Sequence, residues 1–520
     1  MVATPHYLAS MAGVQVLKDG GNALDAAIAA NAVLTVVYPH MCSVGGDAFM
    51  QIWDPREKRL FGLNGAGRSA GKASIEALQG LGLQSMPERG AHAVTVPGAV
   101  HAWYSAHQRF GSKSFGSLFE HAITYADRGF PVSPNLSRSI ALSRPLLERQ
   151  KAALNQYVPN GVLPQAGDIL RLPDLATSLR MIAEQGASAF YGGPIGRAIA
   201  ATIQAEGGFL CEEDIAGHET RWVNPLSTSY RGRDLFELPP PTQGVIALEL
   251  ANIAEGFDIK NLGLNTAEQI HVLVEAKKLA FVDRDRYVTD PDHLDASLDH
   301  LTSKTYADEL RKRIDPRRAF NEEPDRAGLG DTIYLCAVDR DGMCVSLIES
   351  LFQGFGSGLV AEGTGIVLHN RGAGFLLDPE AANRLGPGKQ PMHTLIPGML
   401  MKDGEPDVVI GTMGGHAQAQ IHLQLLCNLV DFELEPQAAI ESPRWVAGRG
   451  LPGDPAHVLN LEEPIGSDVA EQLRAMGHDA RLTQPFSSLM GHAHMIRVDQ
   501  ERGVLMGGSD PRSDGAALGW

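Results

Sequence analysis

Cysteine, aromatic residues and positive charge are all scarce in this 520-residue chain. Its five cysteines lie far apart and form no CxxC pair, so the sequence predicts buried thiols in a reducing compartment and no disulfide framework. Lys and Arg total 44 against 61 Asp and Glu, which leaves a formal net charge of −17. Phosphate repels so acidic a chain, and we therefore expect neither a nucleic acid nor an anionic membrane as a partner.

Long apolar runs are also missing. The nearest candidate, Ala23–Tyr38, contains Asp25 and Asn31, whereas a membrane span needs about 18 uncharged apolar residues. The segment from Met1 to His6 has no basic region ahead of an apolar stretch, so the sequence predicts no secretory signal. Free thiols and the missing signal together favour a cytoplasmic protein.

Helical patterns dominate the first 320 residues. The pattern over 8–18 stops at Gly20-Gly21, and Asn22 is placed to cap a second helix over 23–37 that is apolar nearly all round. A glycine turn then leads into the alternating segment 48–53, which predicts a strand with one covered face.

The pattern changes abruptly to β after an acid-rich stretch over 321–331, which we expect to be a flexible loop. Residues 332–338 and 344–352 are rich in β-formers and flank a turn, which indicates a hairpin. If Gly342 is the left-handed residue of a three-residue loop, the register places Thr332 opposite Ser350. A helix-rich first part and a strand-rich second part suggest stacked sheets between helical layers.

Short motifs follow one another in a fixed order along nearly the whole chain. These are Met1–His6, Gly20–Ala27, Gly45-Gly46, Val96–Gly98, Gly207–Phe209 with Glu213-Asp214, Pro239–Pro241, Asp283-Arg284 with Asp290-Pro291, Gly330–Thr332, Gly386-Pro387, Gly414-Gly415 and Ser509–Arg512. In these motifs and their order the sequence resembles the γ-glutamyltransferase family of N-terminal-nucleophile hydrolases, in a divergent branch similar to oxamate amidohydrolase and cephalosporin acylases.

This resemblance implies an α+β fold, the αββα sandwich, and a precursor that cuts itself. Cleavage between Asp331 and Thr332 would give a large subunit, 1–331, and a small subunit, 332–520, which together form one structural domain and possible dimers of cleaved heterodimers. Thr332 would become the nucleophile, activated by its own freed α-amine. The resemblance further implies that Ser350 orients the Thr332 hydroxyl, and it requires no cofactor and no metal.

The Gly414-Gly415 pair matches the family's oxyanion hole, where backbone N–H groups approach the developing charge. Taken alone, each of these features has a plainer interpretation. Residues 330–332 could be a turn entering a strand, Ser350 could satisfy strand backbone, and an isolated Gly-Gly carries no information.

The positions where relatives bind the γ-glutamyl α-carboxylate and α-ammonium differ here. Ala66 stands at the Arg position with Arg68 two residues later, and His393-Thr394 replaces a Ser pair. At the positions around the ammonium stand Phe352, Arg371 and Gly374. An ammonium would therefore meet a guanidinium, and a buried like charge costs several kcal/mol.

Arg371, His393 and Arg68 suit an acyl group that has a carboxylate and no amine, and Phe352 favours a small one such as oxamate. For Arg371, an exposed or domain-bridging role is the plainer interpretation. Two other functions stay open: a true γ-glutamyltransferase or glutathione hydrolase, and a non-catalytic homologue that serves as a binding module. The histidine pairs His492/His494 and His416/His422 have no third ligand in the sequence pattern, so we interpret them as structural.

Overall fold

The computed structural model describes residues 1–294, 297–320, 330–448, 455 and 457–520. Most of the acid-rich stretch, 321–329, lies outside the described residues, so the expected flexible loop stays a prediction. In the part of the chain that is described, no helix is long and apolar enough to cross a membrane.

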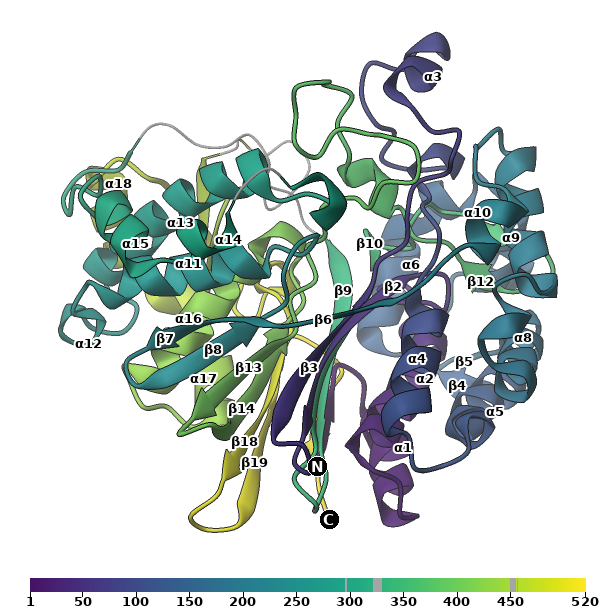
Figure 1. Ribbon diagram of the computed structural model, residues 1–520, viewed down its shortest axis with the longest axis horizontal. Helices are drawn as coiled ribbons and strands as arrows, with labels where there is room; N and C mark the ends of the chain where they lie inside the picture. The colour runs from purple at the N-terminus through teal and green to yellow at the C-terminus, as the bar shows by residue number, and fades with distance from the viewer. Residues whose placement is uncertain (295–296, 321–329, 449–454, 456) are drawn as a thin grey trace.

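Two antiparallel sheets lie face to face in the middle of the molecule (Figure 1). The first has seven strands, in the order β20 (Ala516–Leu518), β1 (Val2–Thr4), β9 (Asp331–Val338), β10 (Cys344–Phe352), β2 (Asp47–Asp54), β3 (Arg59–Gly65) and β6 (Arg221–Val223). The second has six, in the order β19 (Val504–Ser509), β18 (Ala493–Asp499), β14 (Glu405–Thr412), β13 (Gly398–Lys402), β8 (Arg233–Glu237) and β7 (Leu226–Tyr230).

Helices cover the outer face of each sheet, which completes the expected αββα sandwich (Figure 1). The layer beside the first sheet contains α1 (Tyr7–Lys18), α2 (Ala23–Val37), α4 (Ala99–Phe110), α5 (Glu120–Arg128) and α8 (Pro173–Gln185). The layer beside the second contains α11 (Gly244–Glu255), α13 (Ala267–Tyr287), α16 (Gln418–Val430) and α17 (Pro436–Glu441). As predicted, Asn22 caps α2, because its side chain accepts a hydrogen bond from the Asp25 N–H.

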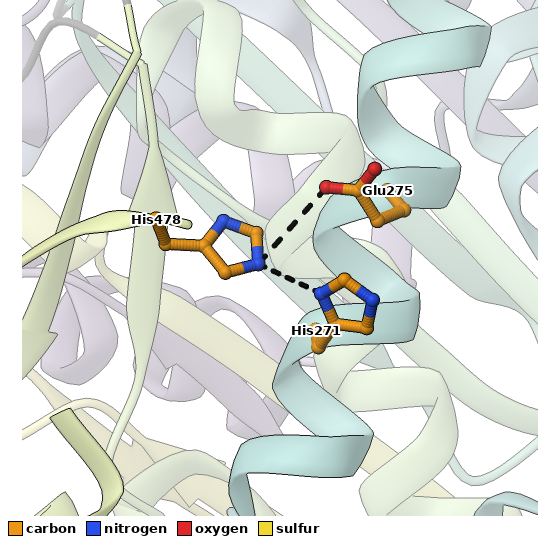
Figure 2. Close-up of side chains that lie close together, drawn as sticks. All are labelled: His271, Glu275 and His478. Carbon is orange, nitrogen blue, oxygen red and sulfur yellow. Dashed lines mark hydrogen bonds and ion pairs between the residues drawn. The ribbon is translucent and has the colours of Figure 1, made fainter. Parts of the chain in front are cut away.

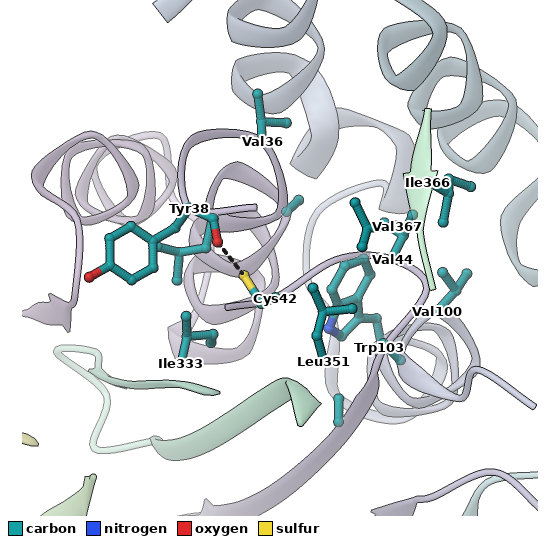
Figure 3. Packing of buried hydrophobic residues seen from close by; sticks show 14 of the residues in the cluster. Val36, Tyr38, Cys42, Val44, Val100, Trp103, Ile333, Leu351, Ile366 and Val367 are labelled. Atoms are coloured by element: carbon teal, nitrogen blue, oxygen red, sulfur yellow. Dashed lines mark hydrogen bonds between the residues drawn. The ribbon is translucent and has the colours of Figure 1, made fainter. Parts of the chain in front are cut away.

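The core beside the first sheet fixes the orientation of β9 and β10. Ile333 and Leu351 both point into it (Figure 3). Leu351 lies beside Trp103, whose indole N–H donates to Asn31 at 2.9 Å. Successive side chains of a strand alternate between faces, so Thr332 and its neighbours of the same parity face the second sheet. Tyr334, two residues on, indeed belongs to the apolar cluster between the sheets.

The expectation for segment 48–53 is wrong in one respect, because β2 is buried on both faces. A central strand between a helical layer and a second sheet has no solvent side. The alternation reflects Gln51, whose amide donates to the carbonyls of Phe236 at 3.0 Å and Pro397 at 2.6 Å. All five cysteines are free, as predicted, and four of them are buried.

Candidate active site

The predicted hairpin register is confirmed, and it brings two hydroxyls together. β9 pairs with β10 so that Thr332 lies opposite Ser350. Gly342 has φ +90° in the connecting turn, where the Asp339 N–H donates to the Met343 carbonyl at 3.1 Å. The two hydroxyl oxygens are 2.9 Å apart, and both residues are buried.

The Ser350 hydroxyl has three partners, and their chemistry fixes the direction of each hydrogen bond. It lies 2.7 Å from the Asp331 carbonyl, which can only accept, so Ser350 donates there. It accepts from the Phe352 N–H at 2.7 Å. Its remaining lone pair therefore accepts from Thr332, which leaves the lone pairs of the Thr332 oxygen available for attack.

Gly414 and Gly415 lie beside the segment that leads into Thr332. They follow β14 and have φ of +145° and +54°, and a short turn from Gly415 opens α16. A Cβ at Gly330 would lie 2.9 Å from the Gly415 Cα and 2.9 Å from the Phe352 carbonyl oxygen. Only glycine fits this approach, so the two backbones are in contact at the start of β9.

Arg371 is buried beside this hairpin and stacks on Phe352. Its guanidinium carbon lies 3.5 Å from the centroid of the phenyl ring, and Nη1 donates to the Thr394 hydroxyl at 3.2 Å. Nε and Nη2 have no hydrogen-bond partner among the residues that the structure describes. Burial lowers the pKa of Arg371 to about 9, against the opposing charge of Asp47, so the side chain is still a cation at neutral pH.

Gly374 and Phe352 shape the space around this guanidinium. A Cβ at Gly374 would lie 2.5 Å from Arg371 Nη2, so the glycine leaves the space that the guanidinium occupies. Phe352 has φ +76°, which is unusual for an aromatic residue, and it follows a register shift in β10. Such a bulge re-aims a side chain, and here the phenyl ring lies against Arg371.

Asp47 lies opposite Ser350 on β2 and was given no role by the sequence analysis. Its buried carboxylate accepts from His393 Nε2 at 2.9 Å and from the N–H groups of Gly67 and Gly98 at 3.2 and 3.1 Å. Burial favours the neutral acid, but the neighbouring histidines outweigh it, so the pKa of Asp47 lies below its usual value. The one available signal was an acid directly after Gly45-Gly46 in an apolar context.

His393 and Arg68 differ from the expectation that both are cations for a substrate carboxylate. Burial lowers the pKa of His393 to about 4, so the ring is neutral and donates to Asp47. Arg68 forms ion pairs with Asp290 at 3.0 Å and Asp292 at 2.9 Å, which compensate its charge. Of these three residues, Arg371 is therefore the one that remains a cation beside the Thr332 hairpin with N–H groups unpartnered in the described part of the chain.

A second residue that the sequence analysis missed, Arg89, supports the loop that packs against the start of β9. Its guanidinium donates to the carbonyl of Gly354 at 2.7 Å and to that of Gly356. The Gly354 N–H in turn stabilises the Asp331 carboxylate, but desolvation dominates and raises the pKa of Asp331 to about 6. Residue 89 lies in an irregular segment, so no periodicity pointed to it.

Histidines of the two pairs have other partners in the structure, such as Ser488, whose hydroxyl lies 3.0 Å from His492 Nε2. His422 forms a two-residue pair with Glu237 at 2.8 Å, and His416 lies edge-on to Phe352. Within the described ranges, one group of three side chains has the spacing of metal ligands, namely His271, Glu275 and His478.

Comparisons with known proteins identify the family of the chain. Residues 9–520 match the family described as Gamma-glutamyltranspeptidase. The chain is 39% identical to the glutathione hydrolase-like YwrD proenzyme of Bacillus subtilis and 36% identical to the oxamate amidohydrolase proenzyme of Klebsiella pneumoniae, covering all of this chain and 98% of each relative. The crystal structure of cephalosporin acylase from Bacillus halodurans superposes with a TM-score of 0.93 at 38% identity, over all of this chain and 95% of that one. The chain therefore belongs to the γ-glutamyltranspeptidase family and is an enzyme with its N-terminal-nucleophile hydrolase fold.

Proposed function

We propose that this enzyme is a self-cleaving amidohydrolase with Thr332 as its nucleophile and the amide of a small, carboxylate-bearing acyl group as its substrate. Cleavage between Asp331 and Thr332 would leave pieces of 331 and 189 residues, because 520 − 331 = 189. Proenzyme relatives along the full length support a precursor that is processed.

Self-cleavage would use the hydrogen bonds around Ser350. The Thr332 oxygen attacks the carbonyl carbon of Asp331, and Ser350, which donates to that carbonyl, polarises it. The Thr332 proton passes to Ser350, which relays a proton through the oxyanion to the peptide nitrogen, and the C–N bond breaks to free the Thr332 α-amine. Water then hydrolyses the resulting ester, which leaves a carboxylate on Asp331 and restores the Thr332 hydroxyl.

The same threonine would then act on the substrate. Its α-amine has a pKa near neutrality and accepts the hydroxyl proton as the oxygen attacks the amide carbon. Backbone N–H groups at Gly414-Gly415 would stabilise the oxyanion, as their contact with the Gly330 segment supports. The amine leaves with a proton, and water releases the acyl group from Thr332.

The observation that carries the substrate proposal is the unsatisfied, buried guanidinium of Arg371. Its Nε and Nη2 are donors without acceptors, and a carboxylate accepts two parallel N–H bonds from such a fork. Gly374 has no side chain at this position. In the part of the chain that is described, the nearby carboxylate is that of Asp47, which already accepts from His393 and two backbone N–H groups, so an α-ammonium would meet the guanidinium instead of a free carboxylate. Phe352 occupies the space beside the guanidinium and favours a short acyl group.

The assignment of Thr332 as the nucleophile can be tested by following self-cleavage of the chain, without any substrate. Thr332→Ala should remain one chain on a denaturing gel and be inactive, whereas Thr332→Ser should still yield pieces of 331 and 189 residues. Cleavage of the alanine variant at the same bond would refute the assignment. A wild type that stays uncleaved and inactive would favour the binding-module alternative.

The substrate class is tested by measuring kcat/KM for ammonia release from oxamate, succinamate and glutamine beside a γ-glutamyl anilide. We expect the amine-free acids to be preferred. Arg371→Gln should weaken their binding by about 2–5 kcal/mol, the cost of breaking a buried charge pair, and should affect a neutral amide less. A preference for the γ-glutamyl compound that survives Arg371→Gln would instead identify a true γ-glutamyltransferase.

A further inference from the structure

Three metal-ligand side chains meet in a buried cluster that the proposed reaction does not use. His271 and Glu275 lie one helical turn apart on α13 and therefore on the same face. His478 reaches them from the residue just before β17 (Asp479–Thr483), near the end of α18 (Ser467–Ala475) (Figure 2). All three residues are buried, and they join a helix of the first part of the chain to the C-terminal part.

The spacing fits one small ion with modest adjustment. His271 Nδ1 lies 2.8 Å from His478 Nε2, which lies 4.0 Å from Glu275 Oε1. One ligand atom of each residue lies within 4.8 Å of the other two. Ligands of a tetrahedral zinc ion, bound at about 2.0–2.1 Å, lie roughly 3.4 Å apart. The 2.8 Å separation would open and the 4.0 Å separation would close by about 0.6 Å each, and the third pair would close by at most about 1.4 Å.

A hydrogen bond already holds His271 in the tautomer that a metal ligand needs, with the lone pair on Nδ1. Its Nε2 lies 2.7 Å from the Asp315 carbonyl, which can only accept, so Nε2 is protonated and Nδ1 has a lone pair. A backbone carbonyl that orients a histidine in this way is the usual outer partner of a metal ligand. In the ion-free cluster, His478 Nε2 donates to that lone pair. Binding would move the His478 proton to its Nδ1 within the same ring.

Glu275 already has a cation beside it. Lys278 donates to Glu275 Oε1 at 2.8 Å and to the Phe320 carbonyl at 2.8 Å, and the Phe320 N–H donates to Oε2 at 2.8 Å. The carboxylate is therefore held in place, and its charge is compensated while the ion is absent. A divalent ion would compete with the Lys278 ammonium for Oε1.

We propose that His271, Glu275 and His478 bind a divalent transition metal, with zinc as the best fit. Two imidazoles and one carboxylate form an N₂O donor set that suits Zn²⁺ or Co²⁺ and not Mg²⁺ or Ca²⁺, which prefer oxygen ligands alone. The ion would clamp α13 to the segment after α18, in the helical layer outside the second sheet (Figure 1). Its role is structural, and it takes no part in the reaction at Thr332.

The test uses tag-free, cleaved protein that has been stripped with a chelator and dialysed. Titration with Zn²⁺ should show one equivalent bound, and Co²⁺ should develop visible d–d absorption of a four-coordinate site. Zn²⁺ should also raise the melting temperature, because an ion that binds only the folded state stabilises it. His271→Ala and the milder His478→Gln should each weaken Zn²⁺ binding at least 100-fold.

His422→Ala is the matched control, because it removes a buried histidine paired with a single carboxylate and should still bind one equivalent. Lys278→Met removes the competing ammonium and should bind Zn²⁺ about tenfold more tightly than the wild type. The proposal is overturned if the stripped wild type takes up no Zn²⁺, or if His271→Ala and His478→Gln bind it as the wild type does. An unchanged or weaker affinity in Lys278→Met would equally overturn the three-ligand site.

Discussion

Ser350 is the side chain whose loss should slow both steps of the proposed chemistry, self-cleavage and turnover. Ser350→Ala removes the donor to the Asp331 carbonyl and the acceptor for the Thr332 proton, and leaves the strand pairing intact. We expect processing to slow and turnover of the processed enzyme to fall by roughly 10²- to 10³-fold, as for other single groups beside a reacting centre.

Two measurements check this expectation, namely the rate at which the two pieces appear and kcat after processing is complete. Ser350→Thr keeps a hydroxyl in the same place and is the control. Wild-type rates in the alanine variant would mean that the contact between the two hydroxyls has no chemical role.

Gly374 provides an independent way to disturb Arg371 without removing it. In Gly374→Ala the new methyl group would lie 2.5 Å from Nη2 and push the guanidinium from its place. One misplaced charge-assisted hydrogen bond costs about 1.5–3 kcal/mol, so kcat/KM for a carboxylate-bearing amide should fall by roughly 10- to 100-fold, mainly through KM.

The control for this substitution is Gly80→Ala, where the added methyl meets no atom within 4 Å. Both variants should fold and process normally. An unchanged KM for oxamate or succinamate in Gly374→Ala would show that the position of the guanidinium does not govern binding.

The site could be predicted from the sequence only where it depends on local structure. Thr332 and Ser350 belong to one hairpin, and the chemistry of its turn was enough to set them opposite each other. Asp47 and Arg89 reach the same region from segments more than 240 residues away. Their positions depend on the tertiary fold, which no local pattern encodes. The ion pairs of Arg68 with Asp290 and Asp292 are long-range in the same sense.

At the scale of the element, the first residue of β9 should make the precursor sensitive to pH. The pKa of Asp331 in the folded chain is about 6, compared with its usual 3.8, chiefly because of desolvation. The folded state therefore binds this proton more tightly than the unfolded state. The resulting stabilisation is complete below about pH 4 and is lost as the pH rises through about 6.

This pH dependence can be measured on the uncleaved Thr332→Ala protein by urea unfolding at pH 4.5 and 7.5. Replacing Asp331 by Asn in that background removes the titration, so the parent should lose about 1–3 kcal/mol more of its unfolding free energy between the two pH values. The contributions of other titrating groups to the unfolding free energy are the same in both proteins and cancel in the difference. Parallel pH profiles for the two proteins would contradict the expected shift.

The sequence predicts the elements that have a cap or a long apolar pattern, and it misses the short strands that have neither. The predicted helices over 8–18 and 23–37 end at glycines or begin at a cap, and their limits agree with α1 and α2 within a residue. Strands β3, β6, β7 and β8 were missed because they are short or lie in a part of the chain whose pattern is mainly helical.

At the scale of the whole molecule, the proposed cleavage divides the chain without dividing the fold. β9 and β10 come from the segment after the cleavage point, yet they lie between β1 and β2 from the segment before it. β20 pairs with the other edge of β1, and β13 pairs with β8 in the second sheet. Neither segment can complete a sheet alone, because each would leave unpaired strand edges and an open apolar face.

The mature enzyme should therefore behave as one cooperative unit. We expect the pieces of 331 and 189 residues to elute together under native conditions and to unfold in one calorimetric transition, because both contribute strands to each sheet. Residues 332–520 produced alone should fail to fold, and production together with 1–331 should restore solubility. Two separate transitions, or a stable 332–520 fragment with native-like circular dichroism, would show that the strand order does not couple the pieces.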